Sequence, residues 1–477
     1  MMISGGVYAS RRQGGVPPQH RRAALSALTG QAIEYYDFFL FGTAAAVALG
    51  RVFFPSDDPV AGTLAAFATF AAGFLVRPIG AIVFGHLGDR IGRKSILVVT
   101  LMLMGSATTA IGVLPTYAMV GVWAPIGLVL LRCLQGFAIG GEWGGASLVA
   151  LEHAPKGRAA FYSSIAQLGS PLGLMASTLM ILLFGTMPDE AFLAWGWRVP
   201  FLFSAVLLAV GLAIRLRLSE TPAFIEVKQA NRRSRLPIAD LLRTAWRPLL
   251  IGTMITLLSS GGWILINTFT ISYAVSHLGL DRGIGLTGQF ITAIIKAALI
   301  LFVGYWAMRR QPRLIAGTGA ALIAAWAFPL YLFVDTGVGA VIWIGQGVAT
   351  VFETLMSAVL PALLAAQFPA HLRYTGISLC YQGGNAIGGL IPVVATYLVA
   401  ETNSSWPLAT LLAGLGVISA LACLSARGNT LDLQPTPATA AHGRSGWLGR
   451  IAPARPPATH VGNDEPTILV NSEARKD

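Results

Sequence analysis

Long apolar stretches, separated by short charged or Pro/Gly-rich breaks, recur along the chain from Ala23 to Ser425. Stretches such as 96–114 and 201–214 are apolar on every face of a helix. Because an α-helix rises about 1.5 Å per residue, about 20 apolar residues cross a hydrocarbon layer about 30 Å thick. The pattern predicts an all-α integral membrane protein. It excludes a transmembrane β-barrel, whose strands alternate apolar and polar positions.

The breaks divide the apolar sequence into twelve predicted transmembrane helices. They cover residues 24–53, 60–88, 95–114, 122–150, 160–184, 196–216, 248–277, 285–308, 313–333, 338–367, 374–400 and 405–426. The longest predicted inner loop, the cytoplasmic residues 217–247, separates two six-helix halves, residues 24–216 and 248–426. Residues 1–23 form a predicted cytoplasmic tail. Residues 427–477, rich in Pro, Ala, Thr and Gly without a periodic apolar pattern, form a predicted disordered cytoplasmic tail.

An internal repeat supports the division into halves. Five residues at the inner start of the fifth predicted helix recur at the inner start of the eleventh, at a shift of 215 positions. The pairs are Arg158/Arg373, Ser163/Ser378, Gln167/Gln382, Gly169/Gly384 and Gly173/Gly388. Duplicated six-helix halves, related by an axis along the membrane normal, are typical of carriers whose substrate site lies between the halves.

The distribution of basic residues predicts the orientation of the chain in the membrane. A net charge of +12 is compatible with binding to nucleic acid. However, only 11% of the residues are charged, against about 25% in soluble domains. Three basic residues fall on the predicted outer side (Arg51, Arg198, Arg282) and three within spans (Arg77, Arg132, Lys296); all others lie in predicted cytoplasmic segments. This asymmetry follows the positive-inside rule and indicates a lipid bilayer, no nucleic acid, and both termini in the cytosol.

The sequence contains no motif typical of an enzyme active site or a metal site. Cys133, Cys380 and Cys423 lie within apolar stretches, and their spacing suggests neither a disulfide nor a metal site. The chain has no His-x-x-x-His, Gly-x-Ser-x-Gly or phosphate-binding Gly-x-x-x-x-Gly-Lys-Ser/Thr sequence. We expect a protein that is not an enzyme and holds no cofactor or metal.

Residues 85–94, Gly-His-Leu-Gly-Asp-Arg-Ile-Gly-Arg-Lys, occupy the predicted inner turn between the second and third helices. Glycines permit a sharp turn, and Asp89 stands where a carboxylate can bond a neighbouring helix N-terminus or Arg93. The sequence resembles the signature of the major facilitator superfamily, which implies a latch that stabilises the state closed to the cytosol. The latch residues so identified are Gly85, Asp89, Arg90, Gly92 and Arg93. At the corresponding place of the second half, Met308 replaces the acid, so we expect a one-sided latch.

Further motifs narrow the resemblance. Residues 132–145, Arg-Cys-Leu-Gln-Gly-Phe-Ala-Ile-Gly-Gly-Glu-Trp-Gly-Gly, together with Glu-Tyr-Tyr-Asp-Phe at 34–38 and Arg-Pro-Ile-Gly at 77–80, are similar to the metabolite:proton symporter family. The resemblance implies an importer of the shikimate, citrate, 2-oxoglutarate or proline/betaine type in the bacterial inner membrane, with the proton as coupling ion. A Gly-Pro-x-x-Gly-Gly antiporter signature is missing, which favours symport.

Charge inside lipid is the physical argument for proton coupling. Seven ionisable residues interrupt the predicted spans: Glu34, Asp37, Arg77, Arg132, Glu142, Lys296 and Glu353. Each costs at least about 2.5–3.5 kcal/mol near the bilayer centre unless it is compensated. Three are basic and four acidic, so one protonated acid would make this set neutral.

Glu34 and Asp37 stand three residues apart on one helical face, where neighbouring carboxylates oppose each other's ionisation. We predict Asp37 as the proton carrier, assisted by Glu34 and Glu142, with Arg132 as the cation that favours its ionised form once proton and substrate leave. The alternative is a permanent structural ion pair. Arg77, about twelve residues from the inner end of its helix, suits bidentate capture of a carboxylate, or an internal pair with an acid.

The remaining predicted substrate contacts are polar residues of spans that face the cavity in this superfamily, and two charges of the second half. They are Gln135, Gln167, Tyr381, Gln382 and Asn385, and Lys296 and Glu353, which can pair with each other. Hydrogen bonds between helices are the alternative role of the uncharged residues.

These observations together predict a monomeric, proton-coupled symporter that imports a small organic acid by alternating access. Two other functions remain open. One is a proline or betaine symporter, although the tail lacks the sustained heptads of a coiled coil. The other is a carrier-shaped sensor that moves no solute.

Overall fold

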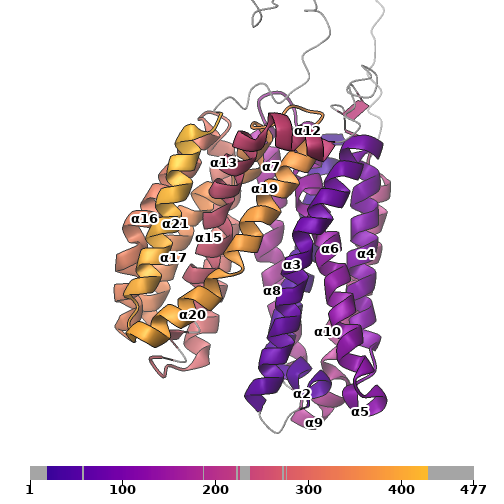
Figure 1. Ribbon diagram of the computed structural model, residues 1–477, viewed down its shortest axis with the longest axis vertical. Coiled ribbons are helices and arrows are strands. Elements are labelled where there is room, and N and C mark those ends of the chain that lie inside the picture. The colour runs from indigo at the N-terminus through magenta and orange to yellow at the C-terminus, as the bar shows by residue number, and fades with distance from the viewer. Residues whose placement is uncertain are drawn as a thin grey trace, which may run out of the picture. The chain divides into compact units, whose positions relative to one another are not determined.

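The computed structural model describes residues 19–55, 59–185, 187–221, 224–225, 237–270, 273–274 and 277–427. Within these residues the secondary structure is helical, without strands (Figure 1). The predicted tail 427–477 lies outside the described residues except for Arg427, as do residues 1–18 of the N-terminal tail and most of 222–236 in the central loop.

The first half contains six long helical segments. They are α1 (Gln19–Ala44) with η1 (Ala45–Leu49) and α2 (Gly50–Phe53); α3 (Pro59–Ile91); α4 (Arg93–Val113); α6 (Trp123–Glu152); α7 (Ala159–Gln167) with α8 (Gly169–Gly185); and α10 (Arg198–Leu216). Short elements connect them: α5 (Tyr117–Val120), α9 (Asp189–Ala191) and η2 (Phe192–Gly196). α1 begins at Gln19, inside the predicted tail.

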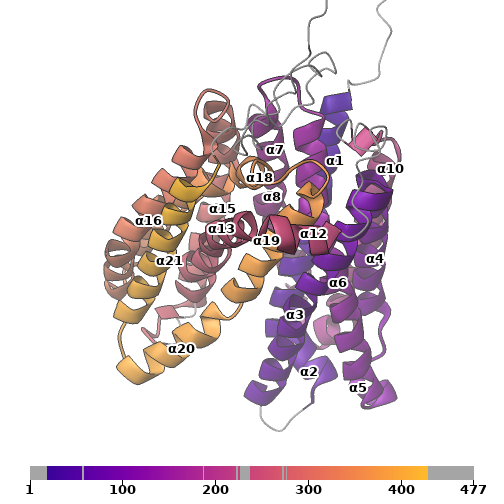
Figure 2. The same ribbon diagram turned by 45° about the horizontal axis from the view of Figure 1, so that its top comes forward.

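The second half repeats this plan. Its segments are α13 (Trp246–Leu257) with η3 (Leu258–Gly262) and η4 (Ile264–Phe269); α15 (Arg282–Trp306); α16 (Pro312–Asp335); α17 (Gly339–Ser357) with α18 (Leu360–Ala365); α19 (Arg373–Gly388) with α20 (Ile391–Thr402); and α21 (Trp406–Ser425). The predicted central loop also contains a helix, α12 (Pro237–Thr244), which packs against both α3 and α19 (Figure 2).

Ten described helices are long and apolar enough to cross a membrane. The two other predicted spans are α1 and the α19–α20 segment. Both are interrupted by polar residues, among them Glu34 and Asp37 in α1 and Gln382 and Asn385 in α19, all of which are buried. Burial against other helices, rather than exposure to lipid, allows these two spans to be polar, and the twelve-helix fold is confirmed.

Glycines bring two helices of the first half into backbone contact. α3 and α6 pack closely, and a Cβ atom added to Gly140 would lie 2.6 Å from the backbone nitrogen of Ala81. Gly136 faces Gly73 in the same way, with 2.9 Å between its added Cβ and the Gly73 Cα. Small residues are the usual means of close helix packing in membranes. The contact fixes Arg77 on α3 relative to Arg132 on α6.

The two halves meet at one end of the bundle, which we call the basic end because it carries Arg90, Arg93, Arg310 and Arg373. There a shared hydrophobic core joins Phe84 and Trp143 of the first half to Leu360, Tyr374 and Ile377 of the second. A separate core of the first half, which includes Phe41, Phe53 and Trp197, contains no residue of the second. The ribbons accordingly converge at the basic end, at the top of Figure 1, and diverge below it.

Candidate substrate and proton site

Asp37 lies at the centre of a buried hydrogen-bond chain. Its side chain is fully buried, and its carboxylate accepts hydrogen bonds from Thr108 Oγ1 (2.6 Å) and Ser204 Oγ (2.8 Å). Gln135 Nε2 donates to Thr108 Oγ1 (2.6 Å), and Arg132 donates to Gln135 Oε1 (2.9 Å). These hydrogen bonds connect α1, α4, α6 and α10, so Asp37 and Arg132 are linked through two neutral side chains.

Arg132 is buried without a carboxylate partner. No acid of the described residues lies within 4.0 Å of its guanidinium, so a direct Asp37–Arg132 ion pair is not formed. The guanidinium carbon lies 4.6 Å from the Phe41 ring centroid and 4.7 Å from that of Phe70. Its Nε and one terminal nitrogen have no hydrogen-bond partner. Aromatic faces stabilise the cation but leave these donors available to an anion.

Glu34 and Arg77 form a second group of unpaired charges. Arg77 is 7% exposed and Glu34 4% exposed, and neither takes part in an ion pair among the described residues. Arg77 lies over the rings of Phe74 (4.2 Å) and Phe38 (5.3 Å), and its Nε has no partner. Oε2 of Glu34 is buried and also unpartnered. Arg77 is thus buried and has no acid of the described residues within 4.0 Å.

Glu142 forms a closed ion pair with Arg215, and Thr100 Oγ1 donates to the same carboxylate (2.7 Å). Sequence analysis assigned Arg215 to the inner side of the membrane, yet its side chain is 1% exposed within α10. The expectation of three basic and four acidic residues inside the spans was therefore wrong: Arg215 makes the numbers equal. The length of an arginine side chain, which reaches inward from a helix end, explains the difference.

An aromatic layer lies where α1, α6 and α19 meet. The rings of Trp143 and Tyr381 stack 3.6 Å apart with an angle of 2°, and the hydroxyls of Tyr35 and Tyr381 are 2.9 Å apart. Gln167 Oε1 accepts from the Trp143 indole nitrogen (3.3 Å). The layer joins the two halves through Tyr381.

Gln382, another predicted polar contact of α19, also crosses to the first half. Gln382 Nε2 donates to the Ile139 carbonyl of α6 (3.3 Å), and Asn385 Nδ2 donates to Gln382 Oε1 (3.5 Å). Of the five uncharged residues singled out in the sequence, Tyr381, Gln382 and Asn385 therefore share α19, while Gln135 and Gln167 belong to the first half.

Lys296 and Glu353 form the predicted pair of the second half, with Nζ 3.0 Å from the carboxylate. Lys296 also lies 4.0 Å from the ring centroid of Trp263, between the π-helical segments η3 and η4. Ser357 donates to the same carboxylate (3.3 Å), while Glu353 Oε1 is buried without a partner. This charge pair is neutral and closed in the observed state.

The predicted latch bridges the halves at the basic end. Asp89 accepts from the backbone nitrogens of Tyr374 (3.3 Å) and Thr375 (3.0 Å) and from the Thr375 hydroxyl (2.9 Å). These groups form the N-terminus of α19, where a helix dipole favours a carboxylate. The expected contact with a neighbouring helix N-terminus is confirmed.

The acid that completes this network was not predicted from the sequence. Glu152, the last residue of α6, is paired with both Arg93 of α4 and Arg373 of α19, the latter at 3.2 Å. Arg93 also donates to the Ala370 carbonyl (3.1 Å). The missed signal was the position of Glu152 at the inner end of a span, next to predicted inner-side arginines.

The other latch residues have smaller roles in the observed contacts. Gly92 has φ of 118°, a conformation that favours glycine, at the tight turn before α4. An added Cβ at Gly85 would lie 2.9 Å from the Thr375 Cα, so the glycine permits close approach of α19. Arg90 is exposed and contacts His86 (3.4 Å).

The mirror position of the second half carries no such network. Met308 stands where Asp89 stands in the first half, and Gln367, 215 positions after Glu152, bonds the backbone of Leu363 and Arg427 instead of an arginine side chain. The latch between halves is therefore made by acids of the first half alone, among the described residues.

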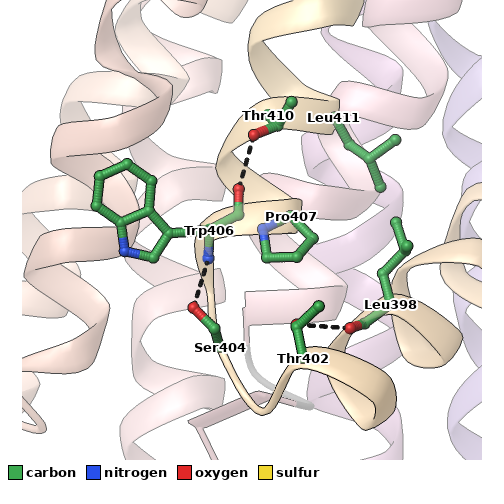
Figure 3. Close-up of a pocket in the computed structure, with 7 residues that line it drawn as sticks. All are labelled: Leu398, Thr402, Ser404, Trp406, Pro407, Thr410 and Leu411. Atoms are coloured by element: carbon green, nitrogen blue, oxygen red, sulfur yellow. Dashed lines mark hydrogen bonds between the residues drawn. The ribbon is translucent and has the colours of Figure 1, made fainter.

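The cavity drawn in Figure 3 is a separate feature. It lies between α20 and α21 at the end opposite the basic end, and residues such as Leu398, Trp406 and Pro407 line it. None of its lining residues is charged, so it offers no group to hold a proton or an acid.

Comparison with known proteins decides the family. The sequence pattern of the Major Facilitator Superfamily matches residues 27–357. The chain belongs to this superfamily. It is 38% identical over 411 residues to the shikimate transporter of Escherichia coli (strain K12), covering 85% of this chain and 94% of that protein. It is 33% identical over 417 residues to the proline/betaine transporter of Salmonella typhimurium (strain LT2), covering 85% and 83%.

Among solved structures, the proton:xylose symporter XylE bound to 6-bromo-6-deoxy-D-glucose is similar, with a TM-score of 0.71 and 15% identity over 85% of this chain and 95% of that one. At this identity the likeness shows the fold. This superfamily member is therefore an integral, multi-pass membrane transporter and not an enzyme.

Proposed function

We propose that this transporter is a proton-coupled symporter that imports a small organic acid across the bacterial inner membrane by alternating access. One observation carries the proposal: Arg77 and Arg132 are buried cations that have no carboxylate of the described residues within 4.0 Å. Leaving a cation unpaired inside a membrane protein is costly. A substrate carboxylate is the partner that would compensate it.

Arg77 is the residue that we propose binds the substrate carboxylate. Its planar guanidinium can bind a carboxylate with two parallel hydrogen bonds. The rings of Phe38 and Phe74 contact the guanidinium without using its hydrogen-bond donors. The nearby Tyr35–Tyr381 hydroxyl pair and the amides of Gln382 and Asn385 offer hydrogen bonds to hydroxyl groups of the cargo.

Asp37 is the proposed proton carrier, and the proton is the only coupling ion we propose. Two hydroxyl donors stabilise its ionised form when the site is empty. Arg132 acts on it through Gln135 and Thr108, so a change at the arginine reaches the acid without direct contact. When cargo binds, its negative charge competes with the Asp37 carboxylate for the same cations, which favours protonation of the acid.

The position of the contacts between the halves supports alternating access. Asp89 and Glu152 join the halves at the basic end, and Tyr381 and Gln382 join them beside Glu34 and Arg77. We propose that the basic end faces the cytosol, together with both chain termini. The observed state is then the one that receives substrate from outside, and transport requires these contacts to break.

The test is uptake by the purified, full-length monomer in proteoliposomes with an acidic exterior. We expect accumulation of labelled shikimate, a monocarboxylic acid, above its external concentration. Arg77→Ala abolishes it, whereas Arg310→Ala, which removes an exposed arginine, does not. A pH gradient that drives accumulation of no organic acid of a broad panel would refute the proposal.

The relatives leave a second candidate, a proline or betaine symporter, because a proline/betaine transporter is also among them. Labelled proline in the same vesicles separates the two. Binding of either compound without accumulation would indicate a sensor rather than a carrier.

A further inference from the structure

The buried charges of the described residues are equal in number. Twelve Asp, Glu, Lys and Arg side chains are buried, six acidic and six basic. The acids are Glu34, Asp37, Asp89, Glu142, Glu152 and Glu353, and the bases are Arg77, Arg93, Arg132, Arg215, Lys296 and Arg373. The empty transporter with every acid ionised is therefore neutral inside.

Most of these charges are already engaged. Glu142–Arg215 and Lys296–Glu353 are closed pairs, and Glu152 binds Arg93 and Arg373. Asp89 is held by the α19 N-terminus. Besides Asp89, four charges have no partner of opposite sign within 4.0 Å: Glu34, Asp37, Arg77 and Arg132. These two acids and two arginines are the part of the neutral set that a cargo can enter.

We propose that the transporter carries one proton with one monoanionic cargo in an electroneutral step. The inference rests on the proposed symport and specifies the charge of its cargo. One proton on Glu34 or Asp37 leaves the buried set at +1, and one carboxylate at the arginines returns it to zero. The count is the same whichever of the two acids takes the proton.

The occluded state gives the physical reason. During the change of access, water is excluded and every uncompensated charge must be desolvated. A neutral empty carrier and a carrier with one proton and one monoanion both meet this condition. A zwitterion with one proton leaves +1 inside, and a dianion requires protons on both acids.

The charged groups that face Glu34 and Asp37 from the helices packed against α1 are Arg77 of α3, Arg132 and Glu142 of α6, and Arg215 of α10. The titratable hydroxyls beside the two acids are those of Tyr35 and Tyr36 of α1 and Tyr381 of α19. Glu142 and Arg215 cancel each other, which leaves the two free arginines to act on the two acids.

The test separates the pH gradient from the membrane potential. Proteoliposomes with the full-length protein receive labelled shikimate, and valinomycin with a potassium gradient sets the potential at equal pH on both sides. We expect a pH gradient to drive accumulation and a potential of either sign to drive none. A step that moved one net charge would change the accumulation ratio by about 50-fold per 100 mV.

The outcomes distinguish this inference from the proposed function. Accumulation driven by a pH gradient and also by potential alone overturns the inference and leaves symport standing. No pH-driven accumulation of any acid of the panel removes both. In competition against labelled shikimate, other monocarboxylates are expected to inhibit, while proline and 2-oxoglutarate do not. Inhibition by proline or 2-oxoglutarate as strong as by the monocarboxylates would contradict the assigned charge.

Variants test the count directly. Asp37→Asn and Glu34→Gln each imitate a permanently protonated acid. The variant at the true carrier is expected to keep exchange of labelled against unlabelled shikimate and to lose pH-driven accumulation. Glu190→Gln, at an exposed acid, keeps both activities. If Asp37→Asn and Glu34→Gln both keep pH-driven accumulation, neither acid carries the proton and the inference fails.

Discussion

Arg77 and Arg132 differ from the other buried cations because aromatic rings, and not carboxylates, surround them. Arg215 and Lys296 have acid partners and belong to the framework. At the scale of the residue, the candidate site is therefore defined by what its charges lack. Burial alone would not distinguish the two groups, since Arg132 and Arg215 are equally buried at 1% exposure.

At the scale of the residue, substitution of Thr108 tests the hydrogen-bond chain between Asp37 and Arg132. Thr108→Val removes a donor to Asp37 and interrupts the connection to Gln135, which makes the ionised carboxylate less stable. A hydrogen bond to a charged group contributes about 1.5–3 kcal/mol. We expect the pH of half-maximal uptake to rise by about 1 to 2 units.

The measurement is initial uptake of shikimate across a series of external pH values. Thr109→Val is the matched control, because among the described residues the Thr109 hydroxyl bonds only the Gly105 carbonyl of its own helix (2.8 Å). A Thr108→Val profile that coincides with that of the control would exclude the chain from proton coupling.

At the scale of the element, close contact between α3 and α6 holds Arg77 and Arg132 in register. Gly140→Ala places a methyl group 2.6 Å from the Ala81 backbone nitrogen and forces the helices apart. Overpacking of this kind costs about 1–3 kcal/mol. We expect a lower unfolding temperature in detergent and weaker shikimate binding, both measured by thermal shift with and without the ligand.

Gly414→Ala in α21 is the control for this prediction, because an added Cβ there meets nothing within 4 Å. Alanine in an open helical position stabilises by about 0.4–1 kcal/mol, so this variant should be unchanged or slightly more stable. Equal stability of Gly140→Ala and Gly414→Ala would show that the α3–α6 contact adapts without cost.

The same elements show how far sequence reasoning reaches. Hydropathy and the 215-residue repeat predicted the twelve spans, because lipid imposes a strong and regular pattern. The motif at 85–94 predicted the contact of Asp89 with a helix N-terminus. Pairing was harder to predict: the Glu142–Arg215 and Glu152–Arg93 contacts join residues far apart in sequence, and only the packing of helices brings them together. For the same reason, the sequence could not predict that Arg77 has no acid partner, because helix packing decides which acids lie near it.

At the scale of the whole molecule, pseudo-symmetric halves are joined by an asymmetric latch. The first half supplies Asp89 and Glu152 to the α19 end, while Met308 and Gln367 stand at the mirror positions. In the proposed transport cycle the basic end opens once per turnover, and each added contact there is expected to stabilise the closed state. Because the second half supplies no acid at the mirror positions, fewer contacts have to break, and the free energy needed to open the basic end is lower.

Restoring that acid tests this interpretation. Met308 follows α15, which packs against α7. We expect the carboxylate of Met308→Asp to reach the first backbone N–H groups of α7, which lack intrahelical partners, as at any helix N-terminus. A carboxylate at a helix N-terminus contributes about 0.3–2 kcal/mol. We expect a longer-lived closed basic end and slower uptake at saturating shikimate, by about 2- to 30-fold.

Spin labels at exposed Arg90 and Arg309, one in each half at the basic end, report the closed fraction through their separation in a variant without the three native cysteines. Met308→Asn, of similar size but uncharged, should keep the original distribution. Asp89→Asn should shift it the opposite way, toward the open state, because it weakens the existing latch. An unchanged distribution in Met308→Asp, alongside a shift in Asp89→Asn, would mean that the asymmetry of the halves does not set the opening equilibrium.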